Sequence, residues 1–550
     1  MKTNRLAVAL SVALLGFAPA FAAAPNDNNA TTKPADSAAM PATQLIQKLM
    51  KPQSSITRGR VTVNGKAIDY QAEAGTLVLD GTGVNESVPE VAIGYTAYFR
   101  QGAAPANRPI TFIYNGGPGS ATMWLHMGSF GPKRVVTNDD THTPAAPYQI
   151  VENQYSLLDA SDLVFIDMPG TGFGRLLPQG ADEKARAESQ KKLAQKYWGV
   201  DQDAQAFARF VTQFLSTHNR WNSPKYLFGE SYGTPRSAVL ANVLTTQYNV
   251  ELNGVMLLSS ILNFSLSVDG AGANPGVDLP YVVGLPTYAA TAWYHHKLPK
   301  YANATVEAVV DDAIKFARGE FQQALLAGIT LDQAQKQDVA QKLSDLIGLP
   351  VPYLMKANLR VDGGMFEEQL LNDTDTTAGR LDSRFTGPSI DPLAKSRSYD
   401  PQSAALSPAY VAALNAYMRN DLKFGDGWVY RPSAHVAPNF RWDYNRAPSP
   451  GQGGGGSRTM ALNVLPDLAR AMKFNPNLKV MLMGGYYDIA TPFYTAIYEL
   501  EHLPIQDSLR KNISYKMYPS GHMVYAHVPS LEKLHGDVAQ FIESTSPASR

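Results

Sequence analysis

The sequence contains no cysteine among its 550 residues. This absence excludes disulfides, thiol nucleophiles and cysteine-ligated metals. A charge excess is also lacking, because 48 Lys and Arg residues balance 48 Asp and Glu residues. Without a basic surplus, we expect no nucleic-acid partner. Beyond the N-terminus no apolar run reaches the ~18 residues that a transmembrane helix needs, so we also expect no stable membrane insertion.

Residues 1–22, MKTNRLAVALSVALLGFAPAFA, have the three parts of a secretory signal peptide. Lys2 and Arg5 precede a short apolar core, and Ala20-Phe21-Ala22 is a small-x-small cleavage site. An uncleaved membrane anchor is the alternative interpretation. The pattern predicts an exported protein, periplasmic or secreted, and an exported chain without cysteine fits a bacterial periplasm.

Three kinds of segment follow the signal peptide. Residues 23–45 are rich in Ala, Pro, Asn, Asp and Thr, which predicts a disordered linker. Short alternating runs between residues 58 and 100 predict antiparallel strands at a sheet edge. After them come continuous apolar runs such as LVFIDMPG, KYLFGES and VMLMGG, which are typical of buried parallel strands.

Helical segments lie between several of these apolar runs, which predicts an α/β core with a mostly parallel central sheet. We assign residues 46–262 and 464–550 to this α/β core. Between them, residues 263–463 interrupt the alternation of strands and helices. This stretch contains amphipathic helices, many Pro and Tyr residues and the run PSPGQGGGGS. This stretch is predicted to be a large helical insertion that caps the site.

The stretch LFGESYGTP, residues 227–235, places Ser231 between two glycines after an apolar run and before a helical segment. A G-x-S-x-G nucleophile elbow of the α/β-hydrolase fold has this strand–turn–helix context. Pro235 fits the first turn of the following helix, where its missing N–H costs nothing. Ser231 is therefore a candidate nucleophile, and the alternative is a turn that happens to contain serine.

A nucleophilic serine needs a base, and the base needs an orienting carboxylate. In this fold they follow the serine in the order Asp, then His, each after a later strand. Asp488 in VMLMGGYYDIATP and His522 in KMYPSGHMVYAHVP have this order and context. His527 is the rival base, although it lies further from the strand end.

An acyl-transfer site also needs N–H donors for the oxyanion. The residue after the nucleophile, Tyr232, supplies one donor from its backbone. The glycine-rich run FIYNGGPGS, residues 112–120, is placed to supply a second after an earlier strand. A phosphate-binding loop is the competing interpretation, but no G-K-[ST] follows the glycines.

These segments together resemble the serine carboxypeptidase family. NGGPGS is similar to the family's N-G-G-P-G-C-S, GESYG to its G-E-S-Y-[GA], and GHMV to its G-H-M-V; the resemblance covers roughly residues 60–265 and 475–545. It implies an α/β-hydrolase fold with no cofactor and no metal.

The resemblance also implies a role for each candidate residue. Ser231 is the nucleophile, Asp488 the orienting carboxylate and His522 the base. The N–H groups of Gly117 and Tyr232 form the oxyanion hole, and two side chains bind the C-terminal carboxylate of a peptide substrate. Those two side chains are Asn115 and Glu230.

Two positions depart from the family's pattern. Ser120 stands where the family has a disulfide-bonded cysteine. The difference removes a covalent cross-link and does not change the catalytic chemistry. A glutamate about twelve residues beyond the oxyanion glycine usually joins the carboxylate-binding network, and counting without gaps places Ser129 there.

The sequence therefore predicts an exported serine carboxypeptidase that cleaves C-terminal peptide bonds through an acyl-enzyme. One alternative is an aminopeptidase or esterase with the same fold, because proline aminopeptidases carry a similar Gly-Gly-Pro-Gly loop. Another is a binding protein with an inactive hydrolase fold. Peptides are the expected partners.

Overall fold

The computed structural model describes residues 40–104, 108–437, 440–446 and 461–546. The predicted signal peptide and most of the predicted linker lie outside the described residues. One correction applies at the linker's end, where helix α1 begins at Ala42 and continues to Leu49. Leu45 and Leu49 are buried and belong to the core, so the chain is already folded before residue 46.

A ten-stranded sheet forms the centre of the described chain, in the order β1-β2-β3-β7-β4-β9-β10-β13-β14 with β8 paired to β3. The strands on the β1 side pair antiparallel, and those from β7 to β14 pair parallel. The bounds are β1 Gln53–Val63, β2 Lys66–Asp80, β3 Pro89–Arg100, β4 Ile110–Tyr114, β7 Asp162–Ile166, β8 Arg175–Leu176, β9 Lys225–Glu230, β10 Gly254–Leu258, β13 Lys479–Gly485 and β14 Ile513–Tyr518.

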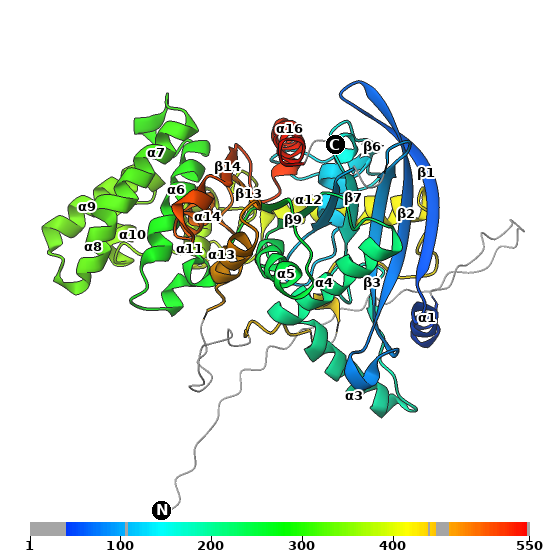
Figure 1. The fold of residues 1–550 in the computed structure, drawn as a ribbon. Coiled ribbons are helices and arrows are strands. Elements are labelled where there is room, and N and C mark those ends of the chain that lie inside the picture. Colours follow the sequence, from blue (N-terminus) through cyan, green and yellow to red (C-terminus); the bar gives the residue numbers. More distant parts are fainter. Residues whose placement is uncertain (1–39, 105–107, 438–439, 447–460, 547–550) are drawn as a thin grey trace, which may run out of the picture. The chain divides into compact units, whose positions relative to one another are not determined.

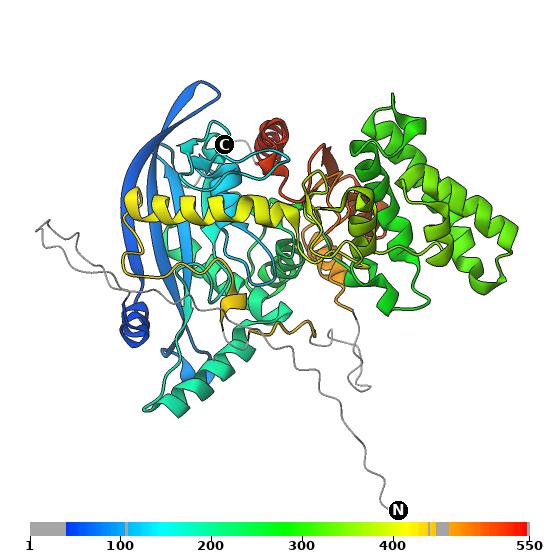
Figure 2. The ribbon, with the colours of Figure 1, turned by 180° about the vertical axis from the view of Figure 1, so that it is seen from behind.

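The inner parallel strands β4, β7, β9 and β10 are buried on both faces, which is why their sequences are mainly apolar. Helices cover one face in front of the sheet in Figure 1, and α12 crosses the opposite face in Figure 2. The front helices are α3 Glu183–Tyr197, α4 Val200–Thr217, α5 Gly233–Gln247, α13 Leu465–Phe474 and α14 Phe493–Glu501. The opposite face packs against α1, α2 Met123–Leu125, α12 Pro401–Asn420 and α16 Val528–Thr545.

Residues 263–463 contain two different kinds of structure. Helices from α6 to α11 form a hydrophobic core of their own, well away from the edge strands β1 and β2 in Figure 1. Their bounds are α6 Leu279–Tyr294, α7 Val306–Phe316, α8 Gln322–Ala327, α9 Gln333–Ile347, α10 Val351–Lys356 and α11 Gly363–Gln369.

Helix α12 differs from the prediction, because it packs with the core and not with the other inserted helices. Its apolar face, including Leu406, Tyr410 and Leu414, is buried in the same cluster as strands of the central sheet. The remaining elements are short: α15 Asp507–Arg510, the pair β5 Lys133–Val135 and β6 Ile150–Glu152, and the pair β11 Thr376–Ala378 and β12 Thr386–Pro388.

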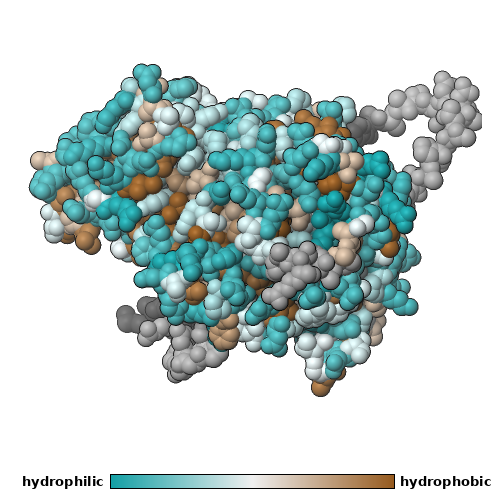
Figure 3. All heavy atoms as spheres, turned by 45° about the horizontal axis from the view of Figure 1, so that its top comes forward, coloured by the Kyte–Doolittle hydropathy of each residue, from teal (hydrophilic) through white to brown (hydrophobic). Residues whose placement is uncertain are grey.

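Figure 3 shows a face that is mainly hydrophilic, with hydrophobic residues gathered in separate small groups. Within the part of the chain that the structure describes, no helix combines the length and the hydropathy that a membrane crossing requires.

Candidate active site

Ser231 lies at a sharp corner between β9 and α5. Its φ angle is 60°, a left-handed conformation that a serine adopts only at a strained position. Glycine is required before it, since a Cβ on Gly229 would lie 2.2 Å from the carbonyl oxygen of Gly233. The tight corner leaves Ser231 partly exposed while the residues around it are buried. This is the geometry of a nucleophile elbow.

The glycine-rich loop after β4 lies directly against this elbow. A Cβ on Gly116 would come within 2.3 Å of the backbone nitrogen of Tyr232, so only glycine permits the approach. Gly117 follows with a φ of +107° and lines the same cleft as Ser231. The two predicted oxyanion donors, the N–H groups of Gly117 and Tyr232, are thus on segments in close contact.

A buried ion pair between Arg236 and Asp203 supports the glycine-rich loop at Asn115. Arg236 on α5 donates to Asp203 on α4 at 2.5 Å and to the carbonyl oxygen of Asn115 at 2.7 Å. Both side chains of the pair are excluded from solvent. This ion pair could not be predicted from the sequence, because Asp203 lies on a helix with an ordinary amphipathic pattern.

His522 and Asp488 are hydrogen-bonded, with 2.7 Å between Nδ1 and Oδ2. They follow neighbouring parallel strands, β14 and β13, which brings two residues 34 positions apart to one sheet edge. Burial lowers the pKa of His522, but the charge of Asp488 and its hydrogen bond outweigh burial and raise the pKa above its usual value. The pair therefore has the contacts that orient a histidine base and stabilise its protonated form.

Thr491 is a third member of this group that sequence reasoning missed. Its hydroxyl donates to Asp488 Oδ2 at 2.6 Å and lies 3.1 Å from His522 Nδ1. Its backbone N–H donates to Asp488 Oδ1 at 3.0 Å. The spacing Asp-x-x-Thr just after the acid was the available signal.

We expect Thr491→Val to lower kcat by roughly 10- to 100-fold with little change in KM. A hydrogen bond to a charged group contributes about 1.5–3 kcal/mol, and each 1.4 kcal/mol is a factor of ten in rate. Steady-state kinetics on one peptide substrate measures the effect. Thr491→Ser keeps the hydroxyl and should retain most activity; equal losses in both variants would contradict the role.

Glu230 and Asn115 form a second buried group beside Ser231. Asn115 Nδ2 donates to Glu230 Oε2 at 2.5 Å, and the Tyr525 hydroxyl donates to the same oxygen at 2.9 Å. Burial raises the pKa of Glu230 to about 7, against the opposing effects of the His522 charge and the Tyr525 hydrogen bond. A carboxyl group that is partly protonated near neutral pH can donate a hydrogen bond to another carboxylate.

Ser129 does not take the place of the family's usual glutamate. Its side chain is fully buried and donates to the carbonyl oxygen of Leu125 at 2.6 Å, within its own helix. Tyr525 packs tightly beside it, since a Cβ on Gly128 would lie 2.6 Å from the Tyr525 ring. The tyrosine hydroxyl therefore provides Glu230 with a neutral partner.

A segment of the insertion, residues 380–384, joins the loops of the acid and the base. The carbonyl oxygen of Arg380 accepts from the backbone N–H groups of Ile489 and Ala490, and that of Leu381 accepts from the backbone N–H of His522 at 2.6 Å. Asp382, paired with Arg384 at 2.7 Å, accepts from Gly521 at 3.1 Å. The insertion thus fixes the geometry between Asp488 and His522.

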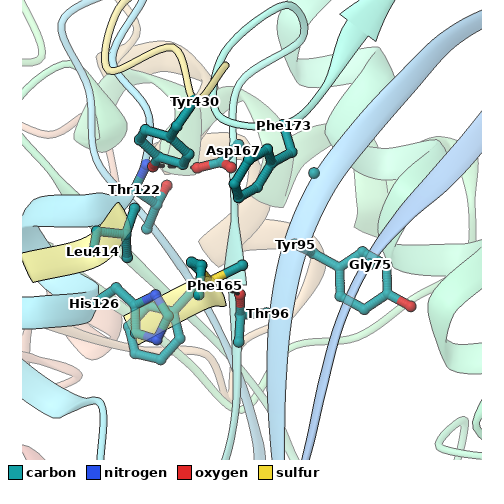
Figure 4. A pocket seen from close by; sticks show the side chains of 12 residues that line it. Gly75, Tyr95, Thr96, Thr122, His126, Phe165, Asp167, Phe173, Leu414 and Tyr430 are labelled. Atoms are coloured by element: carbon teal, nitrogen blue, oxygen red, sulfur yellow. Dashed lines mark hydrogen bonds between the residues drawn. The ribbon is translucent and has the colours of Figure 1, made fainter. Parts of the chain in front are cut away.

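Asp167, which directly follows β7, lies beside a cavity of about 10 Å³, enough for one water molecule (Figure 4). Loss of solvent raises the pKa of Asp167 to about 7. Oδ1 of Asp167 accepts from the N–H of Thr122 at 2.8 Å, and the Thr122 hydroxyl accepts from the N–H of Asn115 at 3.4 Å. Asp167 therefore supports the Asn115 loop through Thr122 and does not line the cleft.

A cleft of about 250 Å³ brings most of the predicted residues together. Its lining includes Asn115, Gly117, Glu230, Ser231 and His522, and its other side consists of insertion residues, namely Arg380, Leu381, Gln402, Ser403, Leu406 and Ser407. Asp488 and Tyr232 are buried behind it.

His527, the rival base, is not part of this cleft. Its Nδ1 lies 2.7 Å from Ser530 Oγ, and its Nε2 lies 3.8 Å from Asp139. In the described ranges no group of three or more His, Asp or Glu side chains is placed to hold a metal ion.

The parallel sheet, the elbow and the acid–base pair on successive strands define an α/β-hydrolase. Residues 95–315 match the family model of serine carboxypeptidases, which confirms the resemblance found in the motifs. Over these residues the chain is similar to serine carboxypeptidases. No curated protein matches it in a sequence search.

Solved structures similar to this chain include a proline iminopeptidase from Mycobacterium smegmatis, 12% identical, with a TM-score of 0.32 over 89% of this chain and 99% of that one. Another is a monoglyceride lipase from Saccharomyces cerevisiae, 12% identical, with a TM-score of 0.32 over 86% of this chain and 96% of that one.

Proposed function

We propose that this protein is an exported serine carboxypeptidase that hydrolyses C-terminal peptide bonds through an acyl-enzyme on Ser231. One observation carries the specificity: the buried Glu230 carboxyl group, bonded to Asn115 and Tyr525, lines the same cleft as Ser231. Export rests on the N-terminal sequence, MKTNRLAVALSVALLGFAPAFA.

In the first half of the reaction, His522 takes the proton of the Ser231 hydroxyl as the oxygen attacks the scissile carbonyl. Negative charge develops on the carbonyl oxygen, where the N–H groups of Gly117 and Tyr232 stabilise it. His522 then protonates the leaving amine, and the C-terminal amino acid departs. Water, activated by the same histidine, hydrolyses the acyl-enzyme and restores Ser231.

Recognition of the C-terminus falls to Asn115 and Glu230 in this proposal. Two carboxylates share a hydrogen bond only when one of them holds a proton, so Glu230 is protonated in the complex. Its raised pKa lowers the cost of that protonation near neutral pH. The Asn115 amide supplies a further donor to the substrate carboxylate.

N-blocked dipeptides and their C-terminal amides test the specificity. A carboxypeptidase cleaves the free acid much faster than the amide, since only the acid completes the hydrogen bonds at Glu230. An esterase treats the two alike, and an aminopeptidase cleaves neither because the N-terminus is blocked. Either of those two results would reject the carboxypeptidase proposal.

The proposal predicts different pH profiles for the two kinds of substrate. Above its pKa of about 7, Glu230 is ionised and repels the substrate carboxylate, so KM for a free acid rises. Below the raised pKa of His522 the base is protonated, so kcat/KM falls for both substrates. We expect the free-acid profile to peak at a lower pH than the amide profile.

Measuring kcat/KM from about pH 5 to 9 with both substrates separates these two limbs. Glu230→Gln keeps a hydrogen-bond donor without a titrating proton, so it should flatten the alkaline rise in KM. Identical profiles for acid and amide in the wild type would show that Glu230 does not read the carboxylate.

A further inference from the structure

Arg380 lines the cleft on the insertion side, and its positive charge acts on the pKa of His522. Its Nε donates to Asp269 Oδ2 at 2.8 Å, and Nη2 donates to the same oxygen. Among the described residues Nη1 has no hydrogen-bond acceptor, and the side chain is 30% exposed. One edge of the guanidinium is therefore fixed by Asp269, and the other remains able to bind a ligand.

Gln402 lies in the first turn of α12 and lines the same cleft. Its side chain is completely buried, and neither its Oε1 nor its Nε2 has a hydrogen-bond partner among the described residues. A buried amide without a partner is costly, so a polar group facing it is expected in the functional state.

The two side chains belong to one local structure. Asp400, the N-cap of α12, accepts from the backbone N–H groups of Arg380 and Leu381 through Oδ1. Its Oδ2 accepts from the N–H and the hydroxyl of Ser403. The acidic side chain is thus fully engaged with these donors, and it ties the start of α12 to Arg380.

The hydrogen-bond donors and the positive charge on this side of the cleft favour binding of an anion. A guanidinium edge and an amide N–H are donors, and the positive end of the α12 dipole adds to them. The carboxylate of Asp269 is engaged by Arg380, and a carboxylate ligand matches both the guanidinium and the amide in size and geometry. A peptide substrate offers such groups as acidic side chains and as its own C-terminus.

We propose that Arg380 and Gln402 bind a carboxylate of the peptide substrate on the insertion side of Ser231, and so make the enzyme selective for acidic peptides. This rests on the proposed peptidase function. With the C-terminal carboxylate at Asn115 and Glu230, the second carboxylate is an acidic side chain next to the scissile bond.

Pairs of N-blocked dipeptides test the proposal: Phe-Glu against Phe-Gln, and Glu-Phe against Gln-Phe. The wild type should prefer the acidic member of one pair by about tenfold in kcat/KM, the effect of losing one charge-assisted hydrogen bond. Arg380→Gln and Gln402→Leu should each reduce that preference to about twofold or less.

Two controls separate recognition from folding. Arg397 pairs with Glu367 and Asp269 in the same charge cluster but does not line the cleft, so Arg397→Gln should keep the preference. Gln402→Leu removes a buried unpaired amide, so its Tm should not fall. An N-blocked amino acid ester without any carboxylate measures indirect effects on the acid and base loops, and in both cleft variants the loss on acidic dipeptides should exceed the loss on this ester.

The same assays identify the source of the carboxylate. If both cleft variants lower kcat/KM equally for all free-acid dipeptides, and by more than for the ester, the bound group is the C-terminal carboxylate. That result would keep a carboxylate site at Arg380 and Gln402 but overturn the selectivity for acidic side chains. If the wild type shows no preference in either pair and the variants leave all free acids unaffected, the proposal is wrong. Equal losses on free acids and on the ester would likewise overturn it.

A different set of results would show that the proposed peptidase function is wrong. A wild type that cleaves the ester and is labelled on Ser231 by a fluorophosphonate, yet cleaves no free-acid dipeptide, rejects the carboxypeptidase proposal. Equal binding of acidic and neutral N-blocked dipeptides as competitive inhibitors of ester cleavage would then reject the carboxylate site as well.

Discussion

Ser231→Ala should abolish turnover, with a loss of about 10⁶ in kcat, because removing the nucleophile of such a group is as damaging as removing the whole group. The remaining residues still bind substrate, so binding of a competitive inhibitor should persist. Alanine is smaller than serine and occupies the same left-handed conformation, and we therefore expect no large change in the free energy of unfolding.

Single-turnover kinetics and fluorophosphonate labelling measure this prediction together. The variant should neither turn over nor take up the label. Ser120→Ala is the matched control, because Ser120 lines the same cleft but has no proposed part in the chemistry. A Ser231→Ala protein that keeps more than a few per cent of wild-type activity would show that another residue is the nucleophile.

The sequence predicted those parts of the site that depend on local chain geometry. A serine at a strained strand-to-helix corner requires glycines at fixed positions around it, so Gly229 and Gly233 make the elbow recognisable in the sequence. The order of Asp488 and His522 could also be predicted, because each follows a predicted strand near the C-terminus.

The residues that sequence reasoning missed act across long separations in the chain. Tyr525 contacts Glu230 from 295 residues away, and Asp382 contacts Gly521 from 139 residues away. Nothing near Asp382 in the sequence marks it as part of the site, because the contact exists only once the insertion has folded onto the core.

The position of α12 was wrong in the prediction for a related reason. Its amphipathic pattern shows that one face is buried but not against which partner. Leu406 and Tyr410 are buried in the core cluster of the sheet, so the helix belongs to the core although it lies inside the predicted insertion. The same helix contributes Gln402 to the cleft, which links the error in the domain boundary to a missed lining residue.

Asp488→Asn should be milder than Ser231→Ala or His522→Ala, with a loss of about 10⁴ in kcat where the other two lose about 10⁶. Asp488 orients His522 and stabilises its charged form without touching the substrate. In the variant, the Thr491 hydroxyl, 3.1 Å from His522 Nδ1, can still accept the proton of that nitrogen and preserve part of the orientation. Asp488→Asn combined with Thr491→Val should therefore be more damaging than Asp488→Asn alone.

The pH profile distinguishes an orienting carboxylate from a merely structural one. Asp488 raises the pKa of His522, so removing its charge lowers that pKa and leaves the base neutral at lower pH. The acid limb of kcat/KM for an amide substrate should consequently move to lower pH in Asp488→Asn, even as the maximum rate falls. If the limb stays in place, or if the variant is fully active, the charge beside His522 comes from another group, and Asp382 in the adjoining segment is the carboxylate to replace next.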